Sequence, residues 1–181
     1  MKICSRLARY GRPAYVNHSI YMLACTLLLV AAAALFSQEK GEAIQWLDFD
    51  KAVAAAKKER KLLVVDFYTD WCGWCKRMER DTYGHPDVIK YARERLVMAK
   101  VNAESQQVTR FKDSELTYQQ LALGFEVRGY PATIFINESG EWLTSVPGYL
   151  KPEQFLPILE FLSEGHYKTM KFEDFKQKRK S

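Results

Sequence analysis

A single apolar run sets the framework for this chain. Residues 62–68 read LLVVDFY, in which only Asp66 is charged. A run of this length is typical of a strand buried on both faces, in a sheet that helices cover. Residues 69–84 turn at once and then take helical spacing, with Trp74 and Met78 one turn apart. We therefore expect a buried strand that passes directly through a turn into a helix.

The rest of the body alternates between helical and strand patterns before it ends in a hairpin. Apolar periodicity, capping residues and turn residues assign each segment. The expected helices are residues 51–61 with Asp48 as their cap, 86–95, 117–124 and 151–163, and the expected strands are 62–68, 96–101, 132–136 and 142–146. The polar residues 105–115 are expected to form a loop. This order predicts an α/β domain with a central mixed β-sheet flanked by helices.

The N-terminal segment, residues 1–37, carries an apolar run from Ile20 to Phe36, which predicts one hydrophobic helix before the domain. That helix would reach roughly 25 Å, the lower limit for crossing the hydrocarbon layer of a membrane. Basic residues precede the run and acidic residues follow it, so the positive-inside rule places the body outside the cytoplasm. The small residues Ala32 and Ala34 are typical of a signal-peptide cleavage site, whereas the long basic segment before the apolar run is typical of a retained membrane anchor. The sequence permits both.

The charge of the chain lies at its two ends. The net charge is +5, to which residues 1–37 contribute +4 and residues 171–181 contribute +3, whereas residues 38–170 hold 18 basic and 20 acidic side chains. A basic surface of the kind that binds nucleic acid is therefore not expected. The chain divides into the N-terminal segment, a domain of residues 38–165 and a basic C-terminal tail of residues 166–181.

Two of the four cysteines, Cys72 and Cys75, lie in the turn and the first helical residues after the buried strand. Unpaired backbone N–H groups and the dipole at the start of a helix favour a thiolate at Cys72. Cys75 lies one turn further along the same helix face, where it can attack a mixed disulfide formed on Cys72. A thiol pair in this position indicates redox chemistry.

Two other roles for the pair fit the sequence less well. A structural zinc ion needs four ligands, usually two such pairs, and His85 is the sole nearby residue that might join this one, so no metal is expected. A disulfide that serves stability alone gains most when it closes a long loop, whereas this pair closes a very short one.

The segment VVDFYTDWCGWCK resembles the active site of thioredoxins, and the resemblance extends over residues 44–163. Thioredoxins carry a buried carboxylate below the disulfide, which matches Asp66, and a lysine beside it, which matches Lys100. Their cis-proline loop matches VRGYPAT, which implies a cis bond before Pro131, and a glycine near their active site matches Gly148. The resemblance therefore implies a thioredoxin fold.

The resemblance also implies roles for these residues. Desolvation would raise the pKa of Asp66 until the carboxylate can accept the proton of Cys75, and pairing with Lys100 would limit that rise. The backbone of Tyr130, before the cis-proline, would bind an extended segment of the substrate. Pro131 and Gly148 would border the same substrate-binding groove.

Trp71 and Trp74 are expected to support the site, and Trp74 stands where thioredoxins usually carry proline. Together with RMERDTYGHPDV after the motif, this departure resembles the thioredoxin-like proteins of bacterial envelopes. That group includes the soluble thiol domain of the interchange protein DsbD and SoxW-type thioredoxins.

We therefore expect a thiol–disulfide oxidoreductase of the bacterial envelope, in the periplasm or on the outer face of the cytoplasmic membrane. It would reduce disulfides in protein substrates without a cofactor, would be recharged by a membrane thiol donor of the DsbD type, and would contact the membrane if its N-terminal segment is retained. The alternatives are a thiol oxidant that introduces disulfides and a non-catalytic module that binds peptides at Pro131. In the tail, Phe172 and Phe175 are expected to pack on the domain and residues 176–180 to be solvated.

Overall fold

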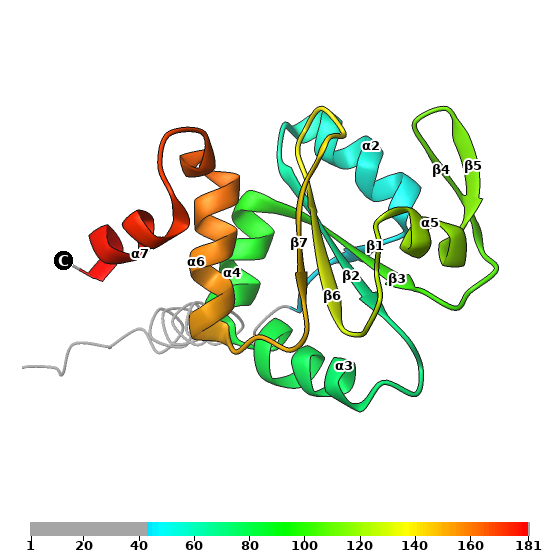
Figure 1. The fold of residues 1–181 in the computed structure, drawn as a ribbon, viewed down its shortest axis with the longest axis horizontal. Helices are drawn as coiled ribbons and strands as arrows, with labels where there is room; N and C mark the ends of the chain where they lie inside the picture. Colours follow the sequence, from blue (N-terminus) through cyan, green and yellow to red (C-terminus); the bar gives the residue numbers. More distant parts are fainter. Residues whose placement is uncertain (1–42, 181) are drawn as a thin grey trace, which may run out of the picture. The chain divides into compact units, whose positions relative to one another are not determined.

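A five-stranded sheet forms the centre of the computed structural model (Figure 1). The strands follow the order β1-β3-β2-β6-β7, in which β1 and β2 run parallel to β3 while β6 and β7 are antiparallel to their neighbours. Their bounds are β1 Trp46–Leu47, β2 Leu62–Tyr68, β3 Leu96–Asn102, β6 Ala132–Ile136 and β7 Trp142–Pro147. The mixed sheet expected from the sequence is thereby confirmed, with the short β1 as an addition.

The structure describes residues 43–180. The expected N-terminal hydrophobic helix, and with it the signal peptide or membrane anchor of residues 1–37, lies outside the described residues. Within residues 43–180, no helix combines the length and the apolar character that crossing a membrane requires.

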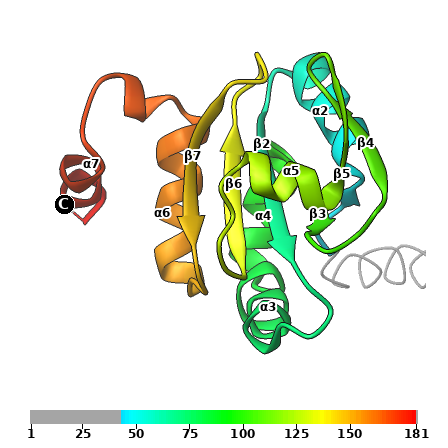
Figure 2. The same ribbon diagram turned by 45° about the vertical axis from the view of Figure 1, so that its right-hand side comes forward.

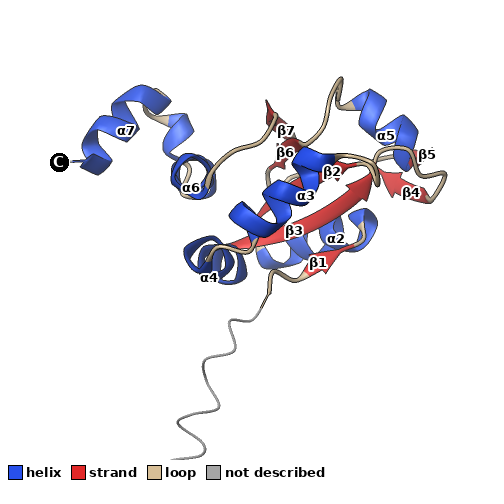
Figure 3. Ribbon diagram, turned by 90° about the horizontal axis from the view of Figure 1, so that it is seen from below, coloured by secondary structure: helices blue, strands red, loops and turns tan. Residues whose placement is uncertain are grey.

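Helices cover both faces of the sheet (Figures 2 and 3). One face packs against α2 (Phe49–Glu59) and α5 (Tyr118–Gly124). The other face packs against α3 (Gly73–Met78), the π-helical turn η1 (Glu79–Tyr83), α4 (Pro86–Arg95) and α6 (Pro152–Ser163). The sheet is therefore buried on both sides, which explains why the sequence of β2 is almost wholly apolar.

The central strand β2 serves both cores because its side chains alternate between the two faces. Leu63, Val65 and Phe67 lie in the core under α2 and α5, whereas Val64 lies in the core under α4 and α6. By the same alternation, Asp66 is directed to the face that α3, η1, α4 and α6 cover. A carboxylic acid thus takes a place in a layer of apolar side chains.

Residues 105–115, expected to be a loop, contain most of a β-hairpin. β4 (Val108–Phe111) pairs with β5 (Ser114–Thr117) in a separate antiparallel sheet. The ring of Phe111 packs edge-on against the ring of Phe49 in α2, at a centroid distance of 5.3 Å. The loop prediction was wrong because a polar segment can still form a hairpin when an aromatic residue fixes it to the core.

Asp48 takes the N-cap position of α2, but its side chain makes no hydrogen bond to the first turn of the helix. Its carboxylate pairs with the ammonium group of Lys51 instead. The expected position of the cap is therefore right, and the expected capping bond is replaced by an exposed ion pair.

The C-terminal residues form a short turn, η2 (His166–Lys168), and a helix, α7 (Phe172–Lys180), which packs on α6. The ring of Phe161 in α6 contacts Phe172 and Phe175 at centroid distances of 5.1 and 5.4 Å. The expected packing of Phe172 and Phe175 on the domain is thereby confirmed.

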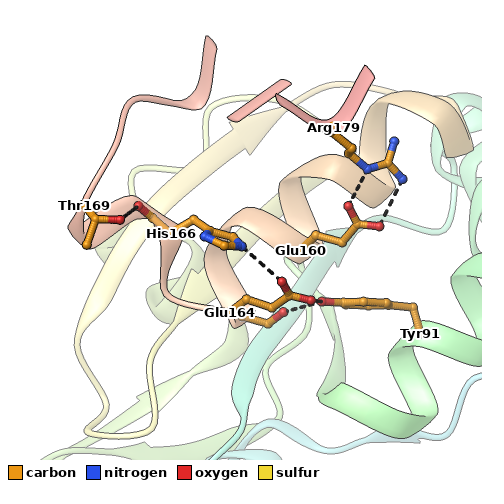
Figure 4. A network of polar contacts seen from close by, with 7 residues as sticks. Tyr91, Glu160, Glu164, His166, Thr169 and Arg179 are labelled. Atoms are coloured by element: carbon orange, nitrogen blue, oxygen red, sulfur yellow. Dashed lines mark hydrogen bonds and ion pairs between the residues drawn. The ribbon is translucent and has the colours of Figure 1, made fainter. Parts of the chain in front are cut away.

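Polar contacts join α6 to α7, to η2 and to α4 (Figure 4). Arg179 of α7 binds both carboxylate oxygens of Glu160 on α6. The carboxylate of Glu164 accepts a hydrogen bond of 3.2 Å from the hydroxyl of Tyr91 on α4 and lies 3.1 Å from Nε2 of His166. Residues 177–179 are exposed, as expected for solvated residues, and Arg179 in addition binds a carboxylate that α6 supplies.

Phe175 provides a test of this packing, because its side chain is 9% exposed whereas the ring of Phe172 is only half-buried. We expect Phe175→Ala to lower the free energy of unfolding by about 2–3 kcal/mol, since it removes a buried ring. Phe172→Ala is the matched control and should cost clearly less. Urea unfolding followed by circular dichroism measures both losses, and equal losses would contradict the packing described.

Candidate active site

The two cysteines lie where β2 passes into α3 (Figure 1). Cys72 is the N-cap residue of α3, and Cys75 lies in the first turn of that helix. The two residues are joined by a disulfide. The turn and the helix expected at this point are therefore confirmed, and the structure represents the oxidised state of the pair.

The backbone of α3 supports the sulfur of Cys72. The N–H group of Cys75 donates a hydrogen bond to this Sγ at 3.0 Å, and the N–H group of Lys76 donates to the carbonyl oxygen of Cys72 at 3.2 Å. A donated hydrogen bond and the positive end of a helix both favour negative charge, so this geometry favours a thiolate once the disulfide is reduced. The relative exposure is 3% for Cys72 and 7% for Cys75. A partner thiol can therefore reach the pair only by contacting the residues around it.

Asp66 lies six residues before Cys72, with a relative exposure of 3%. Burial raises the pKa of its carboxyl group from 3.8 to about 7, because desolvation disfavours the charged form. The positive charge of Lys100 and a hydrogen bond from Tyr83 oppose that rise of the pKa, and the negative charge of Glu79 adds to it. Asp66 can therefore gain or lose a proton near neutral pH.

Lys100 is the cross-strand neighbour of Asp66 on β3. Its ammonium group nevertheless pairs with Oε1 of Glu79 at 2.7 Å and lies 5.0 Å from the ring centre of Tyr68. Among the described residues no ion pair joins Lys100 to Asp66. The expected pairing is thus replaced by an ion pair with Glu79, and Lys100 acts on Asp66 through its charge.

Glu79 and Tyr83 are site residues that the C-x-x-C motif alone does not indicate. Glu79 holds Lys100, and the hydroxyl of Tyr83 donates a hydrogen bond of 3.2 Å to Oδ1 of Asp66. Both residues follow Cys75 at intervals of four along α3 and η1. Helical spacing from Cys75 is the signal that identifies them, because residues four apart share one helix face.

The peptide bond between Tyr130 and Pro131 is cis, as the resemblance implied. Pro131 is buried, and its carbonyl oxygen accepts a hydrogen bond of 2.8 Å from the N–H group of Gly148. Gly148 has a φ of +86°, a conformation that residues with a side chain rarely adopt. The structure thus ties the cis-proline loop to the loop after β7.

Two pairs of aromatic rings include the residues next to the cysteines. Trp71 contacts Tyr130 at a centroid distance of 6.1 Å, and Trp74 contacts Tyr149 at 5.6 Å. The two tryptophans are 67% and 56% exposed, which is unusual for side chains of this size. Trp71, Trp74 and Tyr130 thus offer apolar surface close to the cysteine pair.

Within residues 43–180, no three histidine, cysteine, aspartate or glutamate side chains come together as a set of metal ligands. His85 takes the N-cap position of α4, where its Nδ1 accepts a hydrogen bond of 3.3 Å from the N–H group of Asp87. This histidine therefore begins a helix and does not add a ligand to the cysteine pair.

Residues 49–163, well over half of the chain, match the family model of the thioredoxin-like domain. A protein disulfide-isomerase of Ricinus communis is 26% identical over 139 residues, which cover 77% of this chain and 25% of that protein. A thiol:disulfide interchange protein DsbD of Tatumella citrea is 33% identical over 110 residues, which cover 59% of this chain and 17% of that protein. The chain thus spans a quarter or less of the length of these two relatives.

Solved structures share the fold. A thioredoxin-fold protein from Helicobacter pylori gives a TM-score of 0.60 at 23% identity, over 72% of this chain and 93% of that one. A thioredoxin from Thermus thermophilus gives a TM-score of 0.56 at 22% identity, over 67% of this chain and 88% of that one. With this fold, its disulfide-bonded cysteine pair and the match of residues 49–163, the chain belongs to the thioredoxin-like family.

Proposed function

We propose that this protein is a thiol–disulfide oxidoreductase of the cell envelope that reduces disulfides in protein substrates. The observation that carries the proposal is a cysteine pair at the start of α3 with the buried acid Asp66 on the strand that leads into it. The helix start favours a nucleophilic sulfur at Cys72. The buried acid supplies a proton acceptor whose pKa, about 7, suits neutral conditions.

The reaction begins with the pair in its dithiol form. The thiolate of Cys72 attacks one sulfur of a substrate disulfide, and the other substrate sulfur leaves as a thiolate. Asp66 accepts the proton of the Cys75 thiol, and the Cys75 thiolate then attacks Sγ of Cys72. This step closes the Cys72–Cys75 disulfide and releases the first substrate sulfur. Two electrons have then passed from the protein to the substrate.

The groove for the substrate would be formed by Tyr130, Pro131 and Gly148. An extended segment that carries the disulfide would pair with the backbone of Tyr130, in the manner of an added strand. The exposed rings of Trp71 and Trp74 would contact apolar side chains of that segment, since exposed apolar surface beside a reactive group is typical of a binding site.

The N-terminal sequence supports a location for the protein, and its relatives support a type of electron donor. The apolar run in residues 1–37, with basic residues before it, supports export to the periplasm or to the outer face of the cytoplasmic membrane. Each turnover leaves the pair oxidised, so a donor must return two electrons. The relatives named thiol:disulfide interchange protein DsbD favour a membrane thiol donor of that type.

Trapping tests the assignment of the two cysteines. In cells, Cys75→Ser should accumulate mixed disulfides between Cys72 and substrate proteins, because the resolving sulfur is absent. Cys72→Ser is the matched control and should form no such adducts. Mass spectrometry of non-reduced complexes reads both results. A Cys72→Ser variant that keeps full cellular function would instead support a module that only binds peptides.

The reduction potential tests the direction of electron flow. A reductant should have a potential below about −200 mV, whereas an oxidant that introduces disulfides has one near −120 mV. Equilibration of the full chain with glutathione buffers, in a Cys4→Ser and Cys25→Ser background, measures the potential of Cys72 and Cys75 alone. A reduction potential of about −120 mV would contradict the proposed reductase and support a thiol oxidant that introduces disulfides.

Asp66 should limit stability at high pH. Because folding raises its pKa from 3.8 to about 7, the folded protein holds this proton more tightly than the unfolded chain does. Stability is therefore lost as pH rises from about 4 through 7, by up to roughly 4 kcal/mol. Asp66→Asn stays neutral, so its stability relative to the natural protein should be higher at pH 8 than at pH 4. Denaturant unfolding at both pH values measures this difference in stability. A difference that does not change with pH would contradict the titration of Asp66 inside the folded protein.

A further inference from the structure

One buried hydroxyl group contacts the proposed proton acceptor. The Oη atom of Tyr83 donates a hydrogen bond of 3.2 Å to Oδ1 of Asp66 and lies 3.5 Å from Oγ1 of Thr133. Tyr83 and Asp66 are each 3% exposed, so water does not compete for this contact. In the described part of the chain, no other side chain donates a hydrogen bond to the carboxylate of Asp66.

The ring that carries this hydroxyl is fixed by its neighbours. Tyr83 is the last residue of the π-helical turn η1, a type of turn that often marks functional sites. Its ring packs edge-on against Trp46 at a centroid distance of 5.0 Å and against Phe155 at 5.6 Å. Aromatic packing on two sides holds the hydroxyl at Asp66 independently of the hydrogen bond that it makes.

The described charged residues around Asp66 make no direct hydrogen bond to its carboxylate, whereas Tyr83 does. Lys100 faces Asp66 from β3, but its ammonium group is bound to Glu79 at 2.7 Å. Glu79 and Tyr83 face it from η1, and Thr133, which has no charge, is its cross-strand partner on β6. The only direct hydrogen bond that these groups give to the carboxylate comes from the tyrosine.

We propose that Tyr83 is a positioning residue for the proton transfer from Cys75, and this proposal rests on the function proposed above. Its hydroxyl donates a hydrogen bond to Oδ1 of Asp66, and this bond fixes the orientation of the carboxylate. Oδ2 is then the oxygen that receives the proton from Cys75. The same hydrogen bond stabilises the ionised form of Asp66, which is the form able to accept a proton. Tyr83 itself touches no substrate and exchanges no proton.

The variant Tyr83→Phe isolates the hydroxyl, because it keeps the ring and its contacts with Trp46 and Phe155. Without the donated hydrogen bond, the pKa of Asp66 should rise by about one unit. The closing of the disulfide by Cys75 should then show its pH midpoint shifted upward by the same amount. The rate at pH 7 should fall several-fold, and the rate at pH 9 should match the natural protein.

The experiment uses the reduced full chain with Cys4→Ser and Cys25→Ser, so that only Cys72 and Cys75 react. Mixing with dithiodipyridine releases one thiopyridone when Cys72 attacks and a second when Cys75 closes the disulfide, and rapid-mixing absorbance separates the two phases. Tyr118→Phe is the matched control. It removes a buried tyrosine hydroxyl on the opposite face of the sheet, where that oxygen accepts hydrogen bonds from Phe49 and Gln107. Its second phase should keep the natural midpoint.

Titration of the Asp66 carboxyl carbon by NMR in the oxidised protein gives a second readout that needs no turnover. An upward shift in Tyr83→Phe, with none in Tyr118→Phe, would support the proposal, and an unchanged titration of Asp66 would overturn it. Thr133→Val removes the hydroxyl that lies 3.5 Å from the Tyr83 hydroxyl and leaves the hydrogen bond to Asp66 in place. This variant should not shift the midpoint upward, and an upward shift there would also overturn the proposal. If Asp66→Asn leaves the second phase and its pH dependence unchanged, the proposed role of Asp66 itself fails, whatever Tyr83→Phe shows.

Discussion

Hydrogen bonds along both edges of β2 fix the positions of the residues that the proposed reaction uses. The strand pairs with β3 on one side and β6 on the other, with Asp66 opposite Lys100 and Thr133. Because apolar side chains of β2 fill the cores on both faces, a slip in this register would move every one of them to the wrong face. The strand therefore fixes two things at once: an acid in the interior and the point at which the chain leaves the sheet toward Cys72.

The cysteine pair and the acid differ in how much structure they need. The contact between Sγ of Cys72 and the N–H group of Cys75 forms within four residues, wherever a helix starts at that point. The environment of Asp66 is assembled from β2, β3, β6 and η1, so it exists only in the folded domain. The features that favour a reactive Cys72 thus come from local structure, whereas the features that set the pKa of Asp66 depend on tertiary structure.

Much of this could be predicted from the sequence, because some features are encoded over short distances. The apolar run of β2 and the cysteine spacing each indicate their structure from the residues alone, whereas the cis bond before Pro131 was expected only from the resemblance to thioredoxins. The partner of Lys100 could not be predicted, since it depends on which way η1 turns Glu79 toward β3. The hairpin of β4 and β5 was missed for a similar reason: Phe111 finds its partner on α2, an element distant in sequence. Contacts between elements, more than the elements themselves, limit prediction from a single chain.

The helix α7 changes where the folding unit ends. The family match stops at residue 163, but the rings of Phe172 and Phe175 cover Phe161 on the outer side of α6. A chain cut at the family boundary would leave that side of α6 open to water and prone to self-association and poor solubility. Recombinant work on this protein should therefore keep the last fifteen or so residues, although nothing in the redox motif calls for them.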